Sequence, residues 1–541
     1  MRLADIATLG GRWMVLDCVV LLPFLRFLLR NGYPILRAES VAASIVLAVV
    51  CLALALLARQ RMVFLALAAI ASVLMATVPV VRMLAPWAEL SPRSAAAILG
   101  ALLAAAILLM REKSAVILAV FTLSAFGVDL AQAVAVHFSH QPVATIAAAN
   151  PAPHTLYIVL DEHLGAAGFP AGIAACADAR STLEHTLAAA RFRHFTHAYS
   201  NYPSTVSSLS SLLNRRLLDR RRMFLNENSP QWRWGTRTLQ ENRLVAEFKR
   251  RGYRVEIFQH RAINHAAPGI SVDRIHEYWD RLGQLEQSPG PWFTRFRWLV
   301  GNYQQSDLVL SQVKAFFPFR FAPHTTGPLA AAAIWPAELE QSILQAPTRT
   351  LFFVHLMAPH FPYLYKKDGT VRNLDEWTGD RVDQRSGDLM YRDRYQRYCE
   401  QVQFVSAQLQ GLFGRLQAAG AYSPMTIVIH GDHGSRIRKA FDAGSSTRAA
   451  GSDPESFDYA GAPSLRDLLD RFSALFAFKA PGAAEASVDP EPTSLLNLLA
   501  RTLPLGDPPA PGADSVYLFD AQGHPEPIDL RQIWRNTEGT R

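Results

Sequence analysis

Acidic and imidazole side chains follow three apolar runs of this chain. The runs and the side chains at their ends are TLYIVL (155–160) before Asp161 and Glu162, TLFFVHL (350–356) before His360, and TIVIHGD (426–432) ending at Asp432 with His433 next. Carboxylates and imidazoles that converge from separate segments are common ligands of a divalent cation. Each segment alone has a second interpretation, because an acidic residue after a strand is often a helix N-cap and a histidine can complete a turn.

The Asp432-His433 pair is flanked by glycines, Gly431 and Gly434. A residue without a Cβ lets backbone and ligand approach closely. This segment is therefore harder to explain as a simple cap than the other two.

A hydroxyl-rich segment over residues 199–213 is predicted to run from an extended stretch through a proline turn into a helix. A hydroxyl at a helix N-terminus lies beside free backbone N–H groups and the positive end of the helix dipole, which suits an anionic ester. The same pattern also fits a plain Ser/Thr N-cap followed by a helix, so the segment by itself leaves both interpretations open.

The elements that must position these residues alternate along the chain. Strands are predicted at 155–160, 253–259, 350–356 and 426–432, and helices at 181–190, 236–251 and about 390–419. Continuous apolar strands between helices predict an α/β sandwich with a mostly parallel sheet that is buried on both faces. Ligands of such sheets bind beyond the carboxyl ends of the strands, where the acidic and imidazole residues lie.

The N-terminal quarter has a different composition. Residues 1–140 hold only 11 Lys/Arg and 6 Asp/Glu, and apolar runs cover about 13–30, 41–58, 62–85, 95–110 and 114–138. Each run approaches the ~20 residues that cross a bilayer. We therefore predict a transmembrane domain at 1–138 with about five spans, a linker at 139–153 and a large domain at 154–541. An odd number of spans with the N-terminus inside places the large domain outside, which the loop charges favour only slightly.

The whole-chain composition excludes other classes. The 541 residues are 50% hydrophobic and 18% charged, with a net charge of +8 and no clustered basic block. This excludes a disordered chain and predicts no nucleic-acid partner. Four cysteines without C-x-x-C spacing argue against a zinc knuckle. Cys176 and Cys399 could form one disulfide in an oxidising compartment or remain two thiols.

In their order and spacing, the four segments resemble the alkaline phosphatase/sulfatase superfamily. The closer likeness is to its membrane-anchored branch, the phosphoethanolamine and phosphoglycerol transferases such as lipoteichoic acid synthase. The resemblance covers about 154–480, together with the plan of about five N-terminal spans. It implies a multi-pass protein of a bacterial inner membrane whose catalytic domain of alkaline phosphatase/sulfatase type lies on the periplasmic side.

The resemblance also implies roles for individual residues. Thr205 matches the nucleophilic threonine of the transferases and would also be a metal ligand, while His360 resembles a histidine that contacts substrate or transfers a proton. The other implied metal ligands are Asp161, Glu162, Asp432 and His433. The implied cofactor is a divalent metal ion. Zinc suits the mixed carboxylate and imidazole set, with manganese and magnesium as alternatives.

The chain departs from the superfamily at two places. The stretch Asn201-Tyr202-Pro203-Ser204-Thr205 lacks both the first residue and the arginine of the sulfatase motif C-x-P-S-R or S-x-P-S-R, which argues against a formylglycine sulfatase. Only His524 follows the Asp-His pair, later than the extra histidine that the transferases usually carry. This departure puts a second metal ion and the acceptor in doubt.

The function hypothesis is the transfer of a phospho-substituent from a lipid head group to an envelope acceptor through a phosphothreonine. The implied partners are therefore a membrane lipid or an envelope glycan. One alternative is a hydrolase of phosphate or sulfate esters that uses water as acceptor. Another is a catalytically silent domain that binds a partner or a glycan.

Overall fold

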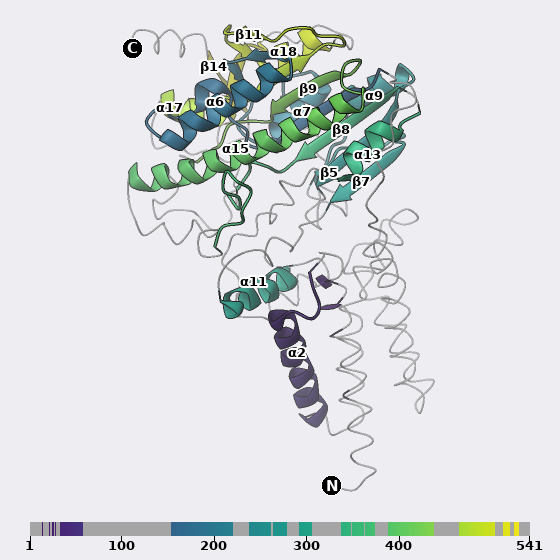
Figure 1. Ribbon diagram of the computed structural model, residues 1–541, viewed down its shortest axis with the longest axis vertical. Helices are drawn as coiled ribbons and strands as arrows, with labels where there is room; N and C mark the ends of the chain where they lie inside the picture. Colours follow the sequence, from purple (N-terminus) through teal and green to yellow (C-terminus); the bar gives the residue numbers. More distant parts are fainter. Residues whose placement is uncertain are drawn as a thin grey trace. The chain divides into compact units, whose positions relative to one another are not determined.

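Figure 1 shows the computed structural model of the protein. It describes residues 33–57, 153–219, 237–260, 263–278, 291–305, 337–347, 349–361, 363–373, 388–437, 465–503, 512–519 and 524–529, together with residues 13, 21, 24, 25, 27 and 28. The chain divides into two compact units. One comprises Met1–Pro142, Arg281–Thr326 and Asn373–Asp375, and the other comprises the remainder. The segment at 281–326, which the sequence assigns to the large domain, is thus grouped with the N-terminal unit, and the predicted domain bounds stay a prediction.

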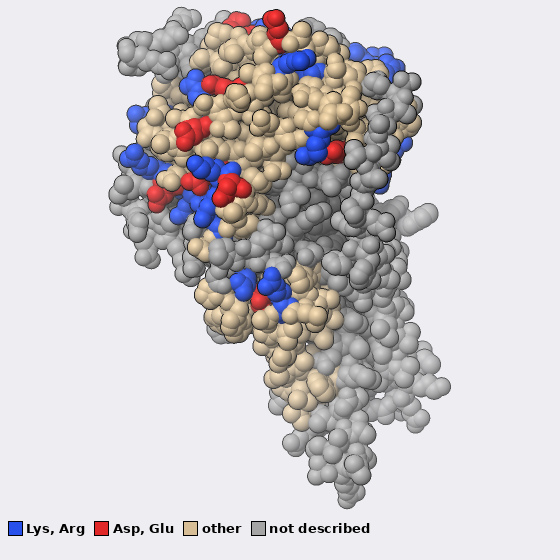
Figure 2. Space-filling model, in the orientation of Figure 1, with Lys and Arg blue, Asp and Glu red and all other residues tan. Residues whose placement is uncertain are grey.

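The first unit contains two described helices, α2 (Ala38–Leu57) and α11 (Trp292–Gln305). Glu39 in the first turn of α2 accepts a hydrogen bond from Arg295 Nε at 3.1 Å, and this ion pair joins the two helices. Figure 2 shows an uncharged surface along α2, with charged side chains only at the end that lies near α11. Among the residues that the structure describes, no helix is long and apolar enough to cross a membrane.

The predicted spans are only partly within the described residues. Helix α2 covers most of the apolar run predicted at 41–58. The runs at 62–85, 95–110 and 114–138, most of the run at 13–30, and the linker except residue 153 lie outside the described residues.

The second unit is built on an eight-stranded sheet in the order β11-β2-β10-β9-β1-β8-β5-β7. Its strands are β1 (Thr155–Leu160), β2 (Arg193–Phe195), β5 (Arg254–His260), β7 (Arg274–Tyr278), β8 (Thr350–Leu356), β9 (Thr426–Gly431), β10 (Phe476–Lys479) and β11 (Ser487–Asp489). Strands β9, β1, β8, β5 and β7 are parallel neighbours, and β10 runs antiparallel to β9 and β2. The predicted α/β fold with a mostly parallel sheet is confirmed.

The remaining described elements are short strand pairs and helices. They are η1 (Ala166–Gly168), α6 (Ala174–Ala189), β3 (Ala198–Tyr199), α7 (Thr205–Asn214), β4 (Arg237–Thr238), α9 (Arg243–Arg250), β6 (Ile263–Asn264), α13 (Ala337–Gln345), α15 (Asp388–Ala418), α17 (Leu465–Phe472), β12 (Thr493–Ser494), α18 (Leu495–Thr502), β13 (Ser515–Phe519) and β14 (Pro525–Asp529).

Both faces of the sheet are covered, as the continuous apolar strands predict. All six residues of β1 are buried. Tyr157 and Val159 pack in one cluster with apolar side chains of α7, α9 and α18. Figure 1 shows α6, α15 and α13 in front of the opposite face. A disulfide between Cys176 and Cys399 joins α6 to α15, which selects one of the two possibilities that the sequence leaves open.

The predicted elements differ from the observed ones mainly at their ends. The helix predicted at 236–251 begins only at Arg243, because the Asn242 side chain accepts a hydrogen bond from Val245 N and so caps it there. Residues 237–238 form β4 instead. The helix predicted at 181–190 begins earlier, at Ala174. The four predicted strands are found within one residue of their predicted bounds.

Candidate metal and nucleophile site

Three neighbouring strands carry the predicted site residues at their carboxyl ends. Strand β1 lies between β9 and β8, and the residue pairs Leu160–Gly431 and Leu160–Leu356 bring all three strand ends level. Asp161 follows β1, Asp432 follows β9, and His360 lies four residues beyond β8. The topology therefore gathers at one edge of the sheet residues that are far apart in the chain.

The two glycines around Asp432 allow close approach of backbone to backbone. A Cβ added to Gly431 would lie 2.2 Å from His163 O, and one added to Gly434 would lie 2.2 Å from Asp470 O. Neither position has room for a side chain. The glycines thus fix how the β9 end packs against its neighbours.

Asp161, Asp432 and His433 form one candidate cation group, with one potential ligand atom of each lying within 4.8 Å of the others. All three residues are fully buried. Asp432 Oδ1 accepts hydrogen bonds from Glu162 N at 2.8 Å and His433 N at 2.9 Å. The second oxygens, Asp161 Oδ2 and Asp432 Oδ2, have no hydrogen-bond partner within the described part of the chain.

The tautomer of His433 suits metal binding. Its Nδ1 lies 2.8 Å from the Gly434 carbonyl oxygen, which can only accept, so Nδ1 carries the proton. Burial lowers the pKa of His433 well below its ordinary value, so the ring is neutral and Nε2 offers a lone pair. A hydrogen bond from the far ring nitrogen is the common way to orient a metal-binding imidazole.

The two buried carboxylates cannot both hold a full negative charge without compensation. Burial raises the pKa of Asp432 well above its usual range, and the charge of Asp161 adds to that rise. Burial also acts to raise the pKa of Asp161, but His360 and His355 outweigh it and lower this pKa. Unpartnered carboxylate oxygens beside a neutral imidazole fit a divalent cation, and the donor types fit zinc, manganese or magnesium.

Thr205 lies beside this group, at the first position of α7. Its Oγ1 is 3.0 Å from His433 Nε2 and 3.4 Å from Asp161 Oδ1. Ser204 precedes the helix in extended conformation and makes no side-chain cap, so the hydroxyl at the helix start is that of Thr205. The first backbone N–H groups of a helix have no partner within it, so such donors flank this hydroxyl.

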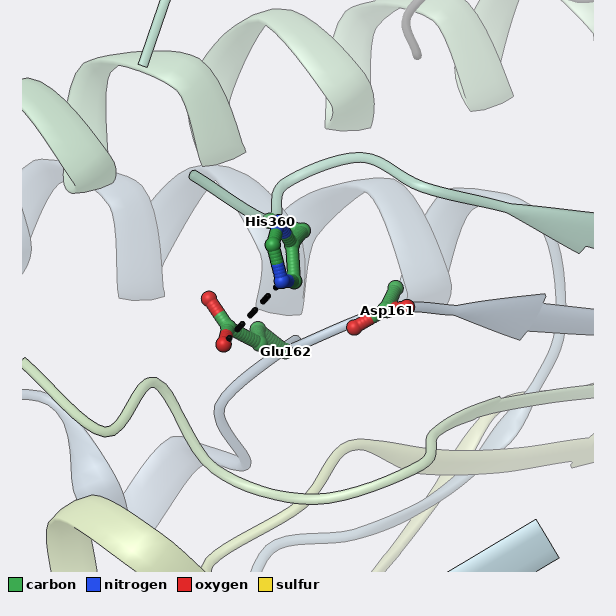
Figure 3. A group of neighbouring side chains, drawn as sticks. All are labelled: Asp161, Glu162 and His360. Atoms are coloured by element: carbon green, nitrogen blue, oxygen red, sulfur yellow. Dashed lines mark ion pairs between the residues drawn. The ribbon is translucent and has the colours of Figure 1, made fainter. Parts of the chain in front are cut away.

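A second candidate cation group contains Asp161, Glu162 and His360, which Figure 3 draws. His360 Nε2 lies 3.5 Å from Glu162 Oε1, and His360 Nδ1 faces the Phe361 carbonyl oxygen. Both groups share Asp161, and together they contain every predicted metal ligand except Thr205, which lies against the first. His524, the only histidine after the Asp-His pair, is exposed and belongs to neither group.

Two residues of the site were not anticipated from the sequence. Arg436 donates to Glu162 Oε1 from Nη2 at 2.6 Å and from Nε at 3.1 Å. His355 is buried, with Nε2 3.6 Å from Asp161 Oδ2 and Nδ1 2.9 Å from His265 Nε2. The sequence signal for both residues was their position alone. Arg436 lies two residues after Gly434, and His355 lies within β8.

A family model described as Sulfatase matches residues 153–460, more than half of the chain. No curated protein matches the chain.

Several solved structures are similar to this chain at low identity. The C-terminal periplasmic domain of EcEptC from Escherichia coli shares 14% identity, covers 72% of this chain and 96% of that one, and gives a TM-score of 0.38. The phosphonate monoester hydrolase from Silicibacter pomeroyi shares 15% identity, with coverage of 65% and 73% and a TM-score of 0.36. The lipoteichoic acid synthase LtaP from Listeria monocytogenes shares 11% identity, with coverage of 72% and 92% and a TM-score of 0.34.

Proposed function

Because the chain belongs to the sulfatase family, we propose that it is a metal-dependent enzyme that transfers a phospho-substituent from a lipid head group to an envelope acceptor through a phosphothreonine. One observation carries the proposal. Thr205 Oγ1 lies 3.0 Å from His433 Nε2 and 3.4 Å from Asp161 Oδ1, next to two unpartnered carboxylate oxygens. A hydroxyl in that position is suited to act as a nucleophile beside a bound cation.

The side chains divide the chemistry between them. Asp161, Asp432 and His433 would hold the cation, which when bound supplies positive charge that makes the hydroxyl more acidic and polarises the phosphoryl group. Asp161 Oδ1 is placed to accept the hydroxyl proton as Thr205 Oγ1 attacks phosphorus. The P–O bond to the lipid alcohol breaks in the same step, and this alcohol takes up a proton and leaves. The free N–H groups at the start of α7 would stabilise charge on the phosphoryl oxygens.

The second half of the reaction needs an acceptor. An acceptor hydroxyl attacks the phosphothreonine, and Thr205 leaves as the hydroxyl again. His360, whose side chain is 20% exposed, is available to contact the substrate or to transfer the proton of the acceptor. Phosphate esters are favoured over sulfate esters because residues 201–205 lack the residue that becomes formylglycine.

A hydrolase is the second candidate, with water in place of the acceptor. The observation that favours it is the absence of a late histidine from the site, since His524 lies in neither cation group among the described residues. The two candidates share the phosphothreonine and differ only in what removes it.

We also propose a multi-pass location in a bacterial inner membrane, with the catalytic unit on the periplasmic side. The apolar runs of the first 138 residues support the membrane part. The disulfide between Cys176 and Cys399 supports an oxidising compartment for the catalytic unit. A periplasm-dependent reporter enzyme fused after residue 541 should be active, and an inactive fusion with full expression would reject this topology.

Intact-mass spectrometry tests the proposed reaction. The purified full chain, loaded with zinc, is incubated with bacterial lipid vesicles and quenched in acid. We expect an adduct on Thr205 whose mass names the transferred group, and no adduct on Thr205→Ala. An adduct of phosphate alone, released to water and not to an added alcohol, would favour the hydrolase. Turnover with full metal content and no adduct on any residue would reject the covalent mechanism.

A further inference from the structure

Arg436 is the arginine that pairs with Glu162. Its guanidinium donates twice to Glu162 Oε1, and the same oxygen faces His360 Nε2 at 3.5 Å. Glu162 is 5% exposed in its side chain, so its charge needs a partner inside the protein. Arg436 supplies that partner, and the negative charge of Glu162 is compensated without a second cation.

The turn that carries Arg436 is fixed by Asp470 of α17. Arg436 N donates to Asp470 O at 3.1 Å, Ile437 N donates to Asp470 Oδ1 at 3.3 Å, and Ser435 Oγ donates to the same carboxylate oxygen. Arg436 itself has a left-handed backbone, with φ of 52°. A residue other than glycine keeps this conformation only where its surroundings hold it. The guanidinium is therefore presented from a fixed backbone.

The guanidinium retains donors for a ligand. An arginine side chain has five N–H groups, and two of them donate to Glu162. The other three donate to no residue in the described ranges, although the side chain is only 22% exposed. Planar N–H pairs of this kind match the oxygens of a phosphate ester.

Arg436 is also linked to the first cation group through Glu162. Glu162 Oε1 accepts from Arg436, and Glu162 N donates to Asp432 Oδ1 at 2.8 Å. A guanidinium beside a bound cation is a repulsive arrangement unless an anion lies between or against the two. A phosphate ester bound at Thr205 would be that anion.

We propose that Arg436 forms an anion subsite that binds the oxygens of the phosphate ester next to the cation group of Asp161, Asp432 and His433. Glu162 is then a positioning residue that orients the guanidinium, and the chain binds one divalent cation, not two. The inference rests on the proposed function only in the choice of a phosphate ester as ligand. It revises the role of Glu162, which the resemblance implies to be a metal ligand.

The test measures metal content and anion binding separately from turnover. The full-length wild type and the variants Arg436→Ala, Arg436→Lys and Glu162→Gln are loaded with zinc or, in separate samples, with manganese. Metal per chain is measured by elemental mass spectrometry, and inorganic phosphate affinity by isothermal titration. Arg415→Ala is the control, because Arg415 makes an equally short ion pair with Glu340, at 2.6 Å, on the surface of α15.

We expect one metal ion per chain in the wild type and in all four variants. Arg436→Ala should weaken phosphate binding about tenfold to a hundredfold, the usual range for losing a hydrogen bond to a charged group. Arg436→Lys should recover part of this affinity, and Glu162→Gln should lose a smaller part. With bis(4-nitrophenyl) phosphate as substrate, added guanidinium should restore turnover to Arg436→Ala and leave Arg415→Ala unchanged.

Two outcomes would overturn the proposal. Two metal ions per wild-type chain that fall to one in Glu162→Gln would make Glu162 and His360 a second cation site. Unchanged phosphate affinity in a folded Arg436→Ala would show that Arg436 does not bind the phosphate. If the alanine variant does not fold, the same result in Arg436→Lys would show it. Failure of the proposed function is recognised separately. If the wild type forms no adduct on Thr205 while phosphate affinity and metal content change among the variants as expected, the anion subsite is supported and the transferase mechanism is rejected.

Discussion

Ser208 Oγ donates a hydrogen bond of 2.5 Å to the main-chain oxygen of Asp432, so the helix that begins at Thr205, the proposed nucleophile, is tied to the loop of the proposed metal ligands Asp432 and His433. Thr205 lies one helical turn before Ser208 in α7. The contact spans 224 residues of sequence and sets the distance between Thr205 and the cation group. Precise placement of a nucleophile strongly affects the rate of attack.

Ser208→Ala should lower kcat and leave metal content unchanged. Loss of this buried hydrogen bond should cost about 0.5–1.5 kcal/mol of stability. Ser211→Ala is the matched control, because Ser211 Oγ makes a part-buried hydrogen bond of 2.7 Å to Arg216 O at the far end of the same helix. Steady-state kinetics and urea unfolding compare the two variants, and equal losses of kcat would show that α7 stability alone matters.

Thr205→Ala should reduce turnover by roughly a thousandfold or more, the scale of losing a covalent nucleophile. Metal content should remain close to that of the wild type, because carboxylates and imidazole are the stronger ligands. Ser204→Ala and Ser207→Ala should keep most activity in the same assay. Activity that survives Thr205→Ala and vanishes in Ser204→Ala would move the nucleophile by one residue.

Asp432→Asn should lose the metal ion. Mutation of a residue that only orients a ligand lowers metal affinity by about 10- to 100-fold, so removal of a ligand itself should lower the affinity by more. A metal ion at 100 times its Kd adds about 2.7 kcal/mol to stability, so chelation should lower the Tm of the wild type and leave that of Asp432→Asn unchanged. Asp489→Asn, which breaks the ion pair with Arg193 away from the site, should respond to chelator as the wild type does.

Gly434→Ala should destabilise the protein by about 1–3 kcal/mol, the usual cost of overpacking. Its Cβ would lie 2.2 Å from Asp470 O, so either the β9 end or α17 must move. Gly414→Ala provides the control, because Gly414 lies in α15 with no atom within 4 Å of the added Cβ. That change should stabilise the protein by up to about 1 kcal/mol through helix propensity. Thermal unfolding of both variants tests whether Gly434→Ala lowers the stability and Gly414→Ala raises it.

His194 should make stability depend on pH. Burial lowers the pKa of His194 to about 4, with Glu184 and Arg180 acting in opposite directions. Because the unfolded histidine binds its proton near pH 6.5, stability is highest above that pH and falls as the pH drops toward 4. The loss should be on the order of 3 kcal/mol at 1.36 kcal/mol per pH unit.

The measurement is the change in unfolding free energy between pH 7 and pH 4.5, compared among variants. His194→Gln should show a smaller change than the wild type, while His185→Gln, an exposed histidine on α6, should not. Equal pH dependence in wild type and His194→Gln would contradict the prediction.

Much of the fold follows from local sequence. TLYIVL and TLFFVHL are apolar at most positions and buried at all of them, so their strand bounds and their burial on both faces were predictable. Strands of two or three residues, such as β2 and β3, were not, because so short a segment has no periodic pattern of its own. Their pairing depends on neighbours hundreds of residues away.

The residues of the candidate site likewise separate into those that the sequence predicts and those that it does not. Asp161, Asp432 and His433 could be found because they directly follow predictable strands. The contact between Arg436 and Glu162 could not, because it depends on two residues with left-handed backbone that local sequence disfavours. Such conformations arise from the surrounding packing, here from Asp470, and no motif in the chain marks them.

The central place of β1 between β8 and β9 has a consequence for how the protein matures. Glu162 and Asp432 are 270 residues apart, yet Glu162 N donates to Asp432 Oδ1 in the finished site. The ribosome must therefore synthesise the chain at least to His433 before Asp161 can lie beside the other two members of the cation group. Binding of a cation at this group therefore requires a chain that is complete at least to His433, because a shorter chain lacks two of the three side chains.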